Sequence, residues 1–227
     1  MGFELTTVVV PLYKTPQYYK YSNFLFVCDE SVLFCISLSI TIRFLLQLFN
    51  MDFLKQKWSY WFSTLDVNHD GMITRADVDQ TLRDFPKVEG LTAKESSLAD
   101  KTIEHWWNTY ILKGRNKVTE EDFLTDLEKQ YKEDKEKFKK TIRTLADEII
   151  GVVDVDKTKQ ISLDNFVKVF KVWGHDNEAL LRKSFELYKP QHGMVSIEEY
   201  TNDWVLFVTN EDPSKPDVVL DTYKNGF

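Results

Sequence analysis

Residues 66–77 read Asp-Val-Asn-His-Asp-Gly-Met-Ile-Thr-Arg-Ala-Asp, and this stretch decides the fold. Side chains that carry oxygen stand at its first, third, fifth, ninth and twelfth positions, with glycine sixth and an apolar residue eighth. A hard divalent cation needs six or more oxygen ligands that converge on one point. Alternate positions of a curling loop can supply them, and glycine permits the sharp turn that a Cβ would obstruct. The stretch is therefore predicted to hold a metal ion.

This spacing is the EF-hand calcium-loop pattern, in which one loop joins two helices. Its twelfth residue is Asp77, one methylene shorter than the bidentate glutamate of high-affinity loops. We expect Asp77 to bind through one oxygen, and six-fold coordination suits magnesium, so Mg²⁺ should compete with Ca²⁺. The predicted ligands are the side chains of Asp66, Asn68, Asp70, Thr74 and Asp77 and the main-chain carbonyl of Met72.

Three later stretches repeat the end of this loop, where an apolar residue is followed by a polar turn and then an aromatic or apolar residue. Such self-similarity indicates repeated supersecondary units, here helix–loop–helix units. The stretches that align with residues 73–78 are 118–123, 161–166 and 195–200, which predict loops at 111–122, 154–165 and 188–199.

The three later loops have lost ligands to different extents. Loop 111–122 has apolar and cationic residues at its first, third and fifth positions, so it should not bind a cation. Loop 188–199 keeps Gly193 and Glu199 but has no acid at those positions, and we expect it to be metal-free. Loop 154–165 is intermediate, because Lys159 replaces the turn glycine and neutral Asn165 the closing carboxylate. Its weak candidate ligands are Asp154, Asp156, Thr158, Gln160 and Asn165.

EF-hands pack in pairs, so loops without metal can persist as scaffolding for their neighbours. We expect an antiparallel bridge of Ile73 with Val118, and another of Ile161 with Val195. The predicted class is all-α, with four EF-hands in two paired lobes that form one compact body and short β-bridges between paired loops. The predicted segments are an N-terminal pair (51–134), a C-terminal pair (135–208) and a tail (209–227).

Helix starts can also be assigned from the sequence. Thr92 with Glu95 forms a capping-box pattern, in which each residue hydrogen-bonds the backbone N–H of the other. Asp176 precedes another apolar helical run and is predicted to cap it.

Residues 1–50 differ from the rest of the chain. They hold both cysteines, Cys28 and Cys35, and an apolar run from Ser31 to Phe49 that is just long enough to cross a bilayer but contains Arg43. Three interpretations stay open for this N-terminal extension: a disordered leader with no functional fold, a membrane anchor, or an apolar helix packed on the body.

Composition excludes several classes of function. The chain carries a net charge of −7 and has no basic patch, which argues against nucleic-acid binding. It has no nucleophile–base constellation and no phosphate-cradling glycine loop, so we expect no catalysis. We expect a monomer whose partner is the calcium ion.

The stretch from Met51 to Phe227 resembles the invertebrate sarcoplasmic calcium-binding proteins. The resemblance rests on an intact first loop with a closing Asp77, a degenerate second loop, many aromatic residues and a tail after the last hand. It implies a cytosolic Ca²⁺/Mg²⁺ buffer, here with mainly one working EF-hand, because family members commonly keep the third loop functional and this chain departs from them there. The resemblance also implies that the protein is located in the sarcoplasm, unless residues 31–49 anchor the chain in a membrane.

The calexcitins and the coelenterazine-binding photoproteins share the same layout, so family membership leaves function open. The first possibility is a buffer, in which calcium binding changes the shape of the protein little. The alternative is a calcium-responsive binding module or sensor, or a carrier of a hydrophobic ligand in the aromatic core, to which six tryptophans contribute.

Overall fold

The computed structural model describes residues 18–21, 24–27, 50–154 and 157–225. The chain falls into two units, Met1–Phe49 and Asn50–Phe227. In the first unit the described residues are β1 (Tyr18–Tyr21) and β2 (Phe24–Val27), an antiparallel pair in which Tyr18 lies opposite Val27.

This hairpin lies in the segment for which the sequence leaves three interpretations open. Aromatic and β-branched residues, which fit a pleated surface, dominate both strands and explain their pairing. The apolar run 31–49, on which the anchor and packed-helix interpretations depend, lies outside the described residues. Among the residues that are described, no helix is long and apolar enough to cross a membrane.

The second unit consists of helix–loop–helix hands, as predicted. It begins with a helix whose described part spans residues 50–65, called here the first helix. The elements that follow are β3 (Met72–Thr74), α2 (Arg75–Glu89), α3 (Ala93–Trp106), the π-helix η1 (Trp107–Leu112), β4 (Lys117–Thr119), α4 (Glu120–Glu133), α5 (Lys135–Val153), β5 (Gln160–Ser162), α6 (Leu163–Val172), α7 (Glu178–Leu187), β6 (Met194–Ser196), α8 (Ile197–Thr209) and α9 (Val218–Lys224). The all-α class with small antiparallel pairs is confirmed.

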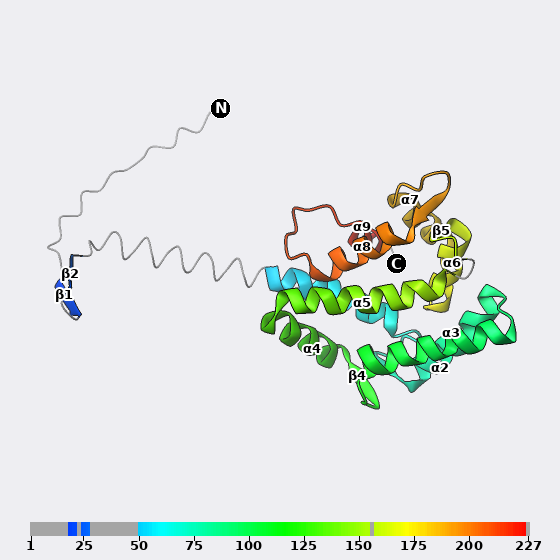
Figure 1. The fold of residues 1–227 in the computed structure, drawn as a ribbon, viewed down its shortest axis with the longest axis horizontal. Helices are drawn as coiled ribbons and strands as arrows, with labels where there is room; N and C mark the ends of the chain where they lie inside the picture. Colours follow the sequence, from blue (N-terminus) through cyan, green and yellow to red (C-terminus); the bar gives the residue numbers. More distant parts are fainter. Residues whose placement is uncertain (1–17, 22–23, 28–49, 155–156, 226–227) are drawn as a thin grey trace. The chain divides into compact units, whose positions relative to one another are not determined.

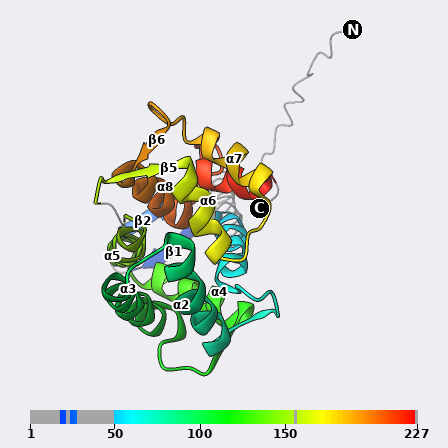
Figure 2. The ribbon, with the colours of Figure 1, turned by 90° about the vertical axis from the view of Figure 1, so that its right-hand side faces the viewer.

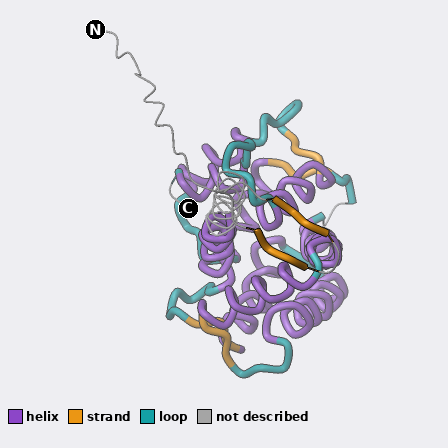
Figure 3. The backbone as a smooth tube through the Cα atoms, turned by 90° about the vertical axis from the view of Figure 1, so that its left-hand side faces the viewer, coloured by secondary structure: helices purple, strands orange, loops and turns teal. Residues whose placement is uncertain are grey.

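The loops pair through their eighth positions, which confirms both predicted bridges. β3 runs antiparallel to β4 with Ile73 opposite Val118, and β5 runs antiparallel to β6 with Ile161 opposite Val195. All four side chains are buried. Figure 3 draws these short strands in orange among the purple helices. Each bridge joins one hand to the next and buries apolar surface that a single hand would expose to water.

The two hand pairs share one core. In Figure 1 the long helix α5 runs between α3 and α8, and it packs against both. Figure 2 shows α6, α7 and α8 gathered at one end of this unit and α2, α3 and α4 at the other, while α2 also packs against α6. Because helices of both pairs contact each other, the buried side chains form a single apolar cluster.

One of the two predicted helix caps is confirmed and one is displaced by a residue. Thr92 and Glu95 form the expected capping box at the start of α3. At the start of α7 the capping residue is Asn177, not Asp176, since the Asn177 side chain accepts a hydrogen bond from the Leu180 N–H at 3.2 Å. An amide oxygen caps as well as a carboxylate, so the sequence did not distinguish these neighbours.

The C-terminal segment is folded and clamps the first helix. Lys57 is fully buried; its Nζ donates to the Asn210 carbonyl at 2.7 Å and lies 3.1 Å from an Asp217 carboxylate oxygen. The other Asp217 oxygen caps α9 by accepting from the Leu220 N–H at 3.0 Å. Burial lowers the pKa of the Lys57 ammonium, and Asp217 opposes this shift. One buried ion pair thus joins the first helix to the start of α9.

Aromatic contacts extend this clamp along the first helix. The Trp58 indole N–H donates to the Val208 carbonyl at 2.9 Å, and the Thr64 and Tyr223 hydroxyls are 2.6 Å apart. The Tyr60 ring stacks on Tyr223 with centroids 5.2 Å apart. The first helix is therefore held to α8 and α9 at four positions over two turns.

Replacing the buried lysine should cost far more stability than replacing an exposed one on the same helix. Lys57→Met leaves the Asp217 carboxylate buried without a cation, and we expect a loss of about 3–5 kcal/mol in the free energy of unfolding. Lys55, whose pair with Glu128 is partly exposed, is the matched control, and Lys55→Met should cost about 1 kcal/mol or less. Urea denaturation measures both, and equal losses would contradict the clamp.

Candidate metal centre

The loop 66–77 places its first and last predicted ligands at the ends of two helices. Asp66 follows the first helix directly and is 6% exposed, whereas Asp77 lies in the first turn of α2 and is fully buried. Asn68 and Asp70 are exposed between them. Met72 and Thr74 are half-buried in β3. The six predicted ligands thus lie along one loop, which runs from the end of the first helix to the first turn of α2.

Hydrogen bonds from the backbone hold this loop in its curled form. The Asp66 carboxylate accepts from the Asp70 N–H at 3.1 Å and the Gly71 N–H at 2.8 Å. At the other end, Asp77 accepts from the Asn68 N–H at 3.3 Å and the Thr74 N–H at 2.7 Å. The loop is closed across its whole length, since the first and twelfth residues each bond to its interior.

Glycine is required at the sixth position by the conformation that the backbone takes there. Gly71 has φ +86°, a left-handed conformation that costs other residues energy. β3 begins directly after Gly71 and pairs with β4. The same glycine therefore allows the loop to turn and leads the chain into the strand that joins the two hands.

The electrostatics of the loop favour a bound cation. Burial raises the pKa of the Asp77 carboxyl; hydrogen bonds from Thr74 and Asn68 lower it, and the nearby Asp66 raises it further. Among the described residues, no lysine, arginine or histidine forms an ion pair with Asp66, Asp70 or Asp77. Buried carboxylates without a cationic partner are costly, and a divalent ion would supply the missing charge. The donor set, which is entirely oxygen, fits Ca²⁺ or Mg²⁺.

The side chains of this loop are not gathered into a closed shell in this conformation. Within the described part of the chain, no three His, Cys, Asp or Glu side chains lie together at metal-holding distance. Asn68 and Asp70 instead accept hydrogen bonds from nearby N–H groups of the loop. The backbone of the loop follows the curled path that a cation site needs, but the side chains do not yet converge on one point.

The second loop, which is predicted to bind no metal, holds two cationic side chains of its own. Arg115 donates to the Ile111 and Leu112 carbonyls at 3.3 and 3.2 Å and to the Asp126 carboxylate at 2.8 Å. Lys113 lies 3.7 Å from the same carboxylate. The guanidinium therefore ties the end of η1 to α4. Sequence reasoning missed Asp126; two cations at ligand positions were the signal that an acid must lie nearby.

In its described residues, the third loop repeats one backbone hydrogen bond of the first loop. Asp154 is buried and accepts from the Lys159 N–H at 3.1 Å, the counterpart of the bond between Asp66 and Gly71. Lys159 has φ +58°, so a lysine occupies the conformation that glycine takes in the first loop. Thr158 and Gln160 are exposed, Asn165 is half-buried, and Asp156 lies outside the described residues.

The fourth loop is a hairpin turn rather than a ring. Gln191 and Met194 exchange backbone hydrogen bonds of 2.8 and 3.0 Å. The two residues between them, His192 and Gly193, have φ +54° and +79°, as a two-residue turn of this kind requires. That this loop binds no metal stays a prediction.

The chain is similar to known EF-hand proteins. Residues 55–128, which include the first two loops, match a family model described as an EF-hand domain pair. A sarcoplasmic calcium-binding protein from Mizuhopecten yessoensis is 34% identical over 176 residues, which cover 77% of this chain and 99% of that protein. The chain belongs to the sarcoplasmic calcium-binding protein family. Like its relatives, it binds calcium through EF-hands and is not an enzyme.

Solved structures show the same fold at lower sequence identity. The calcium-loaded apo form of the coelenterazine-binding protein from Renilla muelleri gives a TM-score of 0.62 at 17% identity, covering 75% of this chain and 94% of that one. A sarcoplasmic calcium-binding protein from amphioxus gives 0.53 at 20% identity, covering 75% and 96%. N-aequorin gives 0.58 at 20% identity, covering 77% and 95%.

Removal of the first ligand should abolish the main binding event. Asp66→Ala deletes the buried carboxylate at the first position, so we expect the strongest calcium-binding step to disappear in isothermal titration. Asp79→Ala is the matched control, because Asp79 is an exposed carboxylate of α2 that follows the loop and pairs with Arg75. Retention of tight binding by Asp66→Ala would show that this loop is not the calcium site.

The third loop should be repairable in two changes. Lys159→Gly removes the strain of a side chain at positive φ, about 1–2 kcal/mol, and Asn165→Glu restores the closing carboxylate. We expect the double variant to bind one more calcium ion per chain than the wild type, by titration. Lys159→Gly alone should raise stability without adding a site. An unchanged stoichiometry in the double variant would mean that more than these two positions prevents binding.

Proposed function

We propose that this protein is a calcium buffer with mainly one working EF-hand, loop 66–77. In this role the protein acts only by binding calcium, which lowers the concentration of the free ion. The ligands are those predicted from the sequence, with Asp66 and Asp77 supplying the buried charges. Loop 154–165 contributes weakly, and loops 111–122 and 188–199 serve as structural partners.

The clamp on the first helix is the observation that carries this proposal. A sensor EF-hand opens when its two helices change their angle and expose an apolar groove. Here the helix that leads into the working loop is held through Lys57, Trp58 and Thr64 to the C-terminal segment. The first helix cannot swing away from the body unless a buried ion pair separates, so we expect binding to change the shape little.

Composition supports the same choice. Sensor grooves often adapt to their targets through methionines, and this chain has four in its whole length. The short Asp77 side chain favours a site at which magnesium competes with calcium, as in a buffer that exchanges one ion for the other. We place the protein in the cytoplasm as a monomer, in keeping with the name of its sarcoplasmic relative.

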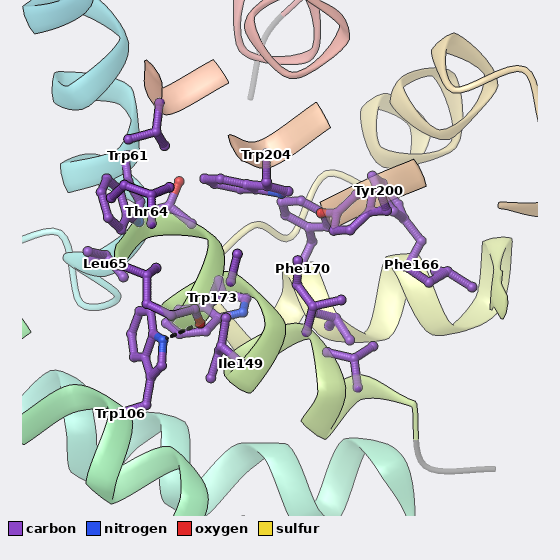
Figure 4. A pocket seen from close by; sticks show the side chains of 18 residues that line it. Trp61, Thr64, Leu65, Trp106, Ile149, Phe166, Phe170, Trp173, Tyr200 and Trp204 are labelled. Carbon is purple, nitrogen blue, oxygen red and sulfur yellow. Dashed lines mark hydrogen bonds between the residues drawn. The ribbon is translucent and has the colours of Figure 1, made fainter. Parts of the chain in front are cut away.

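An internal cavity favours a second candidate, a carrier of a hydrophobic ligand. Figure 4 shows aromatic side chains from the first helix, α3, α6 and α8 around one apolar space of about 90 Å³. Trp106, whose indole N–H donates to the Leu145 carbonyl at 2.8 Å, stands on the opposite side from Trp204. One similar structure is named a coelenterazine-binding protein and two others are named photoproteins, which suggests the comparison.

The size of the cavity argues against a large ligand. A cavity of roughly 150 Å³ accommodates benzene, and drug-sized ligands occupy about 300–1,000 Å³. At about 90 Å³ the space in this chain is below both, so a ligand larger than a few atoms would have to displace side chains. The cavity is better explained as imperfect packing among large rings, and the buffer remains our first choice.

One titration separates the three roles. We would follow the emission of a hydrophobic dye while calcium is added to the full chain. A buffer should give low emission with and without calcium, because no apolar surface opens. A large rise on calcium addition would instead identify a sensor, and high emission already in the absence of calcium would favour the ligand carrier.

Isothermal titration with calcium, with and without millimolar magnesium, tests the ion competition. We expect magnesium to weaken the apparent calcium affinity, because both ions need the same six oxygens. Asp77→Glu is the informative variant, since the longer side chain can supply two oxygens and should favour calcium over magnesium. A calcium affinity that magnesium leaves unchanged would rule out the mixed site.

A further inference from the structure

The turn between α6 and α7 lies directly against the working calcium loop. Gly174, in this turn, has φ +83°, and its carbonyl is 3.4 Å from the His69 imidazole Nε2. A Cβ added to Gly174 would stand 2.7 Å from the Val67 carbonyl oxygen and 3.2 Å from His69 Nε2. The first approach is shorter than Cβ atoms tolerate and the second is tight, so glycine is what allows the two backbones to lie this close.

The contact touches the loop between its ligands. Val67 and His69 are the second and fourth residues of the loop and alternate with the predicted ligands Asp66, Asn68 and Asp70. Val67 is 2% exposed, so its position is fixed by what packs on it. Calcium ligands must lie within about 2.3–2.6 Å of the ion, and a shift of the Val67 carbonyl would move the ligands on both sides of it.

The turn also connects the loop to the third hand and to the cavity. α6 begins directly after β5 of the third hand and packs against α2, which leaves the working loop. Trp173, the residue before Gly174, lines the cavity, and its ring centroid is 6.2 Å from that of Trp106 and 5.7 Å from that of Trp107. The C-terminal hand pair thus meets the working hand at the loop and at the helix after it.

We propose that the turn after α6 is a positioning element of the calcium loop, and that Gly174 is the residue on which this contact depends. The proposal rests on calcium binding at loop 66–77. In this arrangement the third hand holds the first loop in its binding shape although it binds calcium weakly itself. Linkage is reciprocal, so calcium at the first loop must also act on the turn and on Trp173.

Two glycine variants test the proposal. Gly174→Ala and Gly90→Ala each place a Cβ at positive φ, +83° and +65°, and so incur the same kind of backbone strain. A Cβ on Gly90 would meet nothing within 4 Å, whereas one on Gly174 would push on the calcium loop. We expect Gly174→Ala to weaken calcium binding by roughly tenfold or more, measured by titration of the full chain, and Gly90→Ala to stay within about twofold of the wild type.

Tryptophan fluorescence tests the same contact with other variants, in case Gly174→Ala fails to fold. Calcium should change the tryptophan emission of the wild type and of Trp204→Phe, but much less that of Trp173→Phe. An unaltered calcium response in Trp173→Phe, or equal affinities in the two glycine variants, would overturn the role of Gly174 while leaving the buffer intact. Absence of calcium binding in the wild type would overturn the proposed function first and this proposal with it.

Discussion

Every hand in this chain depends on the pairing of two loops through one short antiparallel bridge. A helix–loop–helix unit has an apolar face that it cannot bury alone, and the residue at the eighth loop position is where its backbone meets a partner. Ile73 with Val118, and Ile161 with Val195, make these contacts in the core. This constraint explains why loops without ligands persist, since deleting one would expose its partner's backbone and apolar face.

The first two loops satisfy the same electrostatic requirement in opposite ways. In loop 66–77 two buried carboxylates face no cationic side chain within the described residues, and an ion must be supplied from solution. In loop 111–122 the cation is part of the chain, because Arg115 bonds to the carbonyls that end η1 and to Asp126 on α4. A tethered guanidinium supplies this charge without a metal, so under the proposed function the second hand should keep its shape at any calcium concentration and the first should respond to calcium.

The C-terminal half of the body restrains the working hand from two sides. The buried Lys57–Asp217 pair holds the helix before the loop, and the turn at Gly174 lies against the loop itself. Both contacts join residues more than one hundred positions apart in the sequence. Because close-packed interiors transmit displacement and do not absorb it, a hand held at both places has little freedom to open. Rigidity of this kind suits a protein that stores an ion better than one that signals its arrival.

The sequence by itself determined the parts of this protein that depend on local chemistry. The order of oxygen donors, the turn glycine at position 71 and the apolar eighth positions fixed the hands and the pairing of their strands, because each reflects a conformation set within a dozen residues. The Thr92–Glu95 cap is local in the same sense. The hairpin at 18–27 escaped prediction because short aromatic runs fit several structures, and the choice between Asp176 and Asn177 as a cap turned on one residue of spacing.

Only the tertiary structure decided which distant groups meet. Nothing near Lys57 in the sequence marks it for burial, and its partner Asp217 was predicted only as part of a tail. Two cations in the second loop indicate a nearby acid but not which one, and only the folded chain brings Asp126 to Arg115 and Gly174 to Val67. These contacts arise from how whole helices pack, and packing depends on the shapes of all the side chains in the shared core and not on any local pattern.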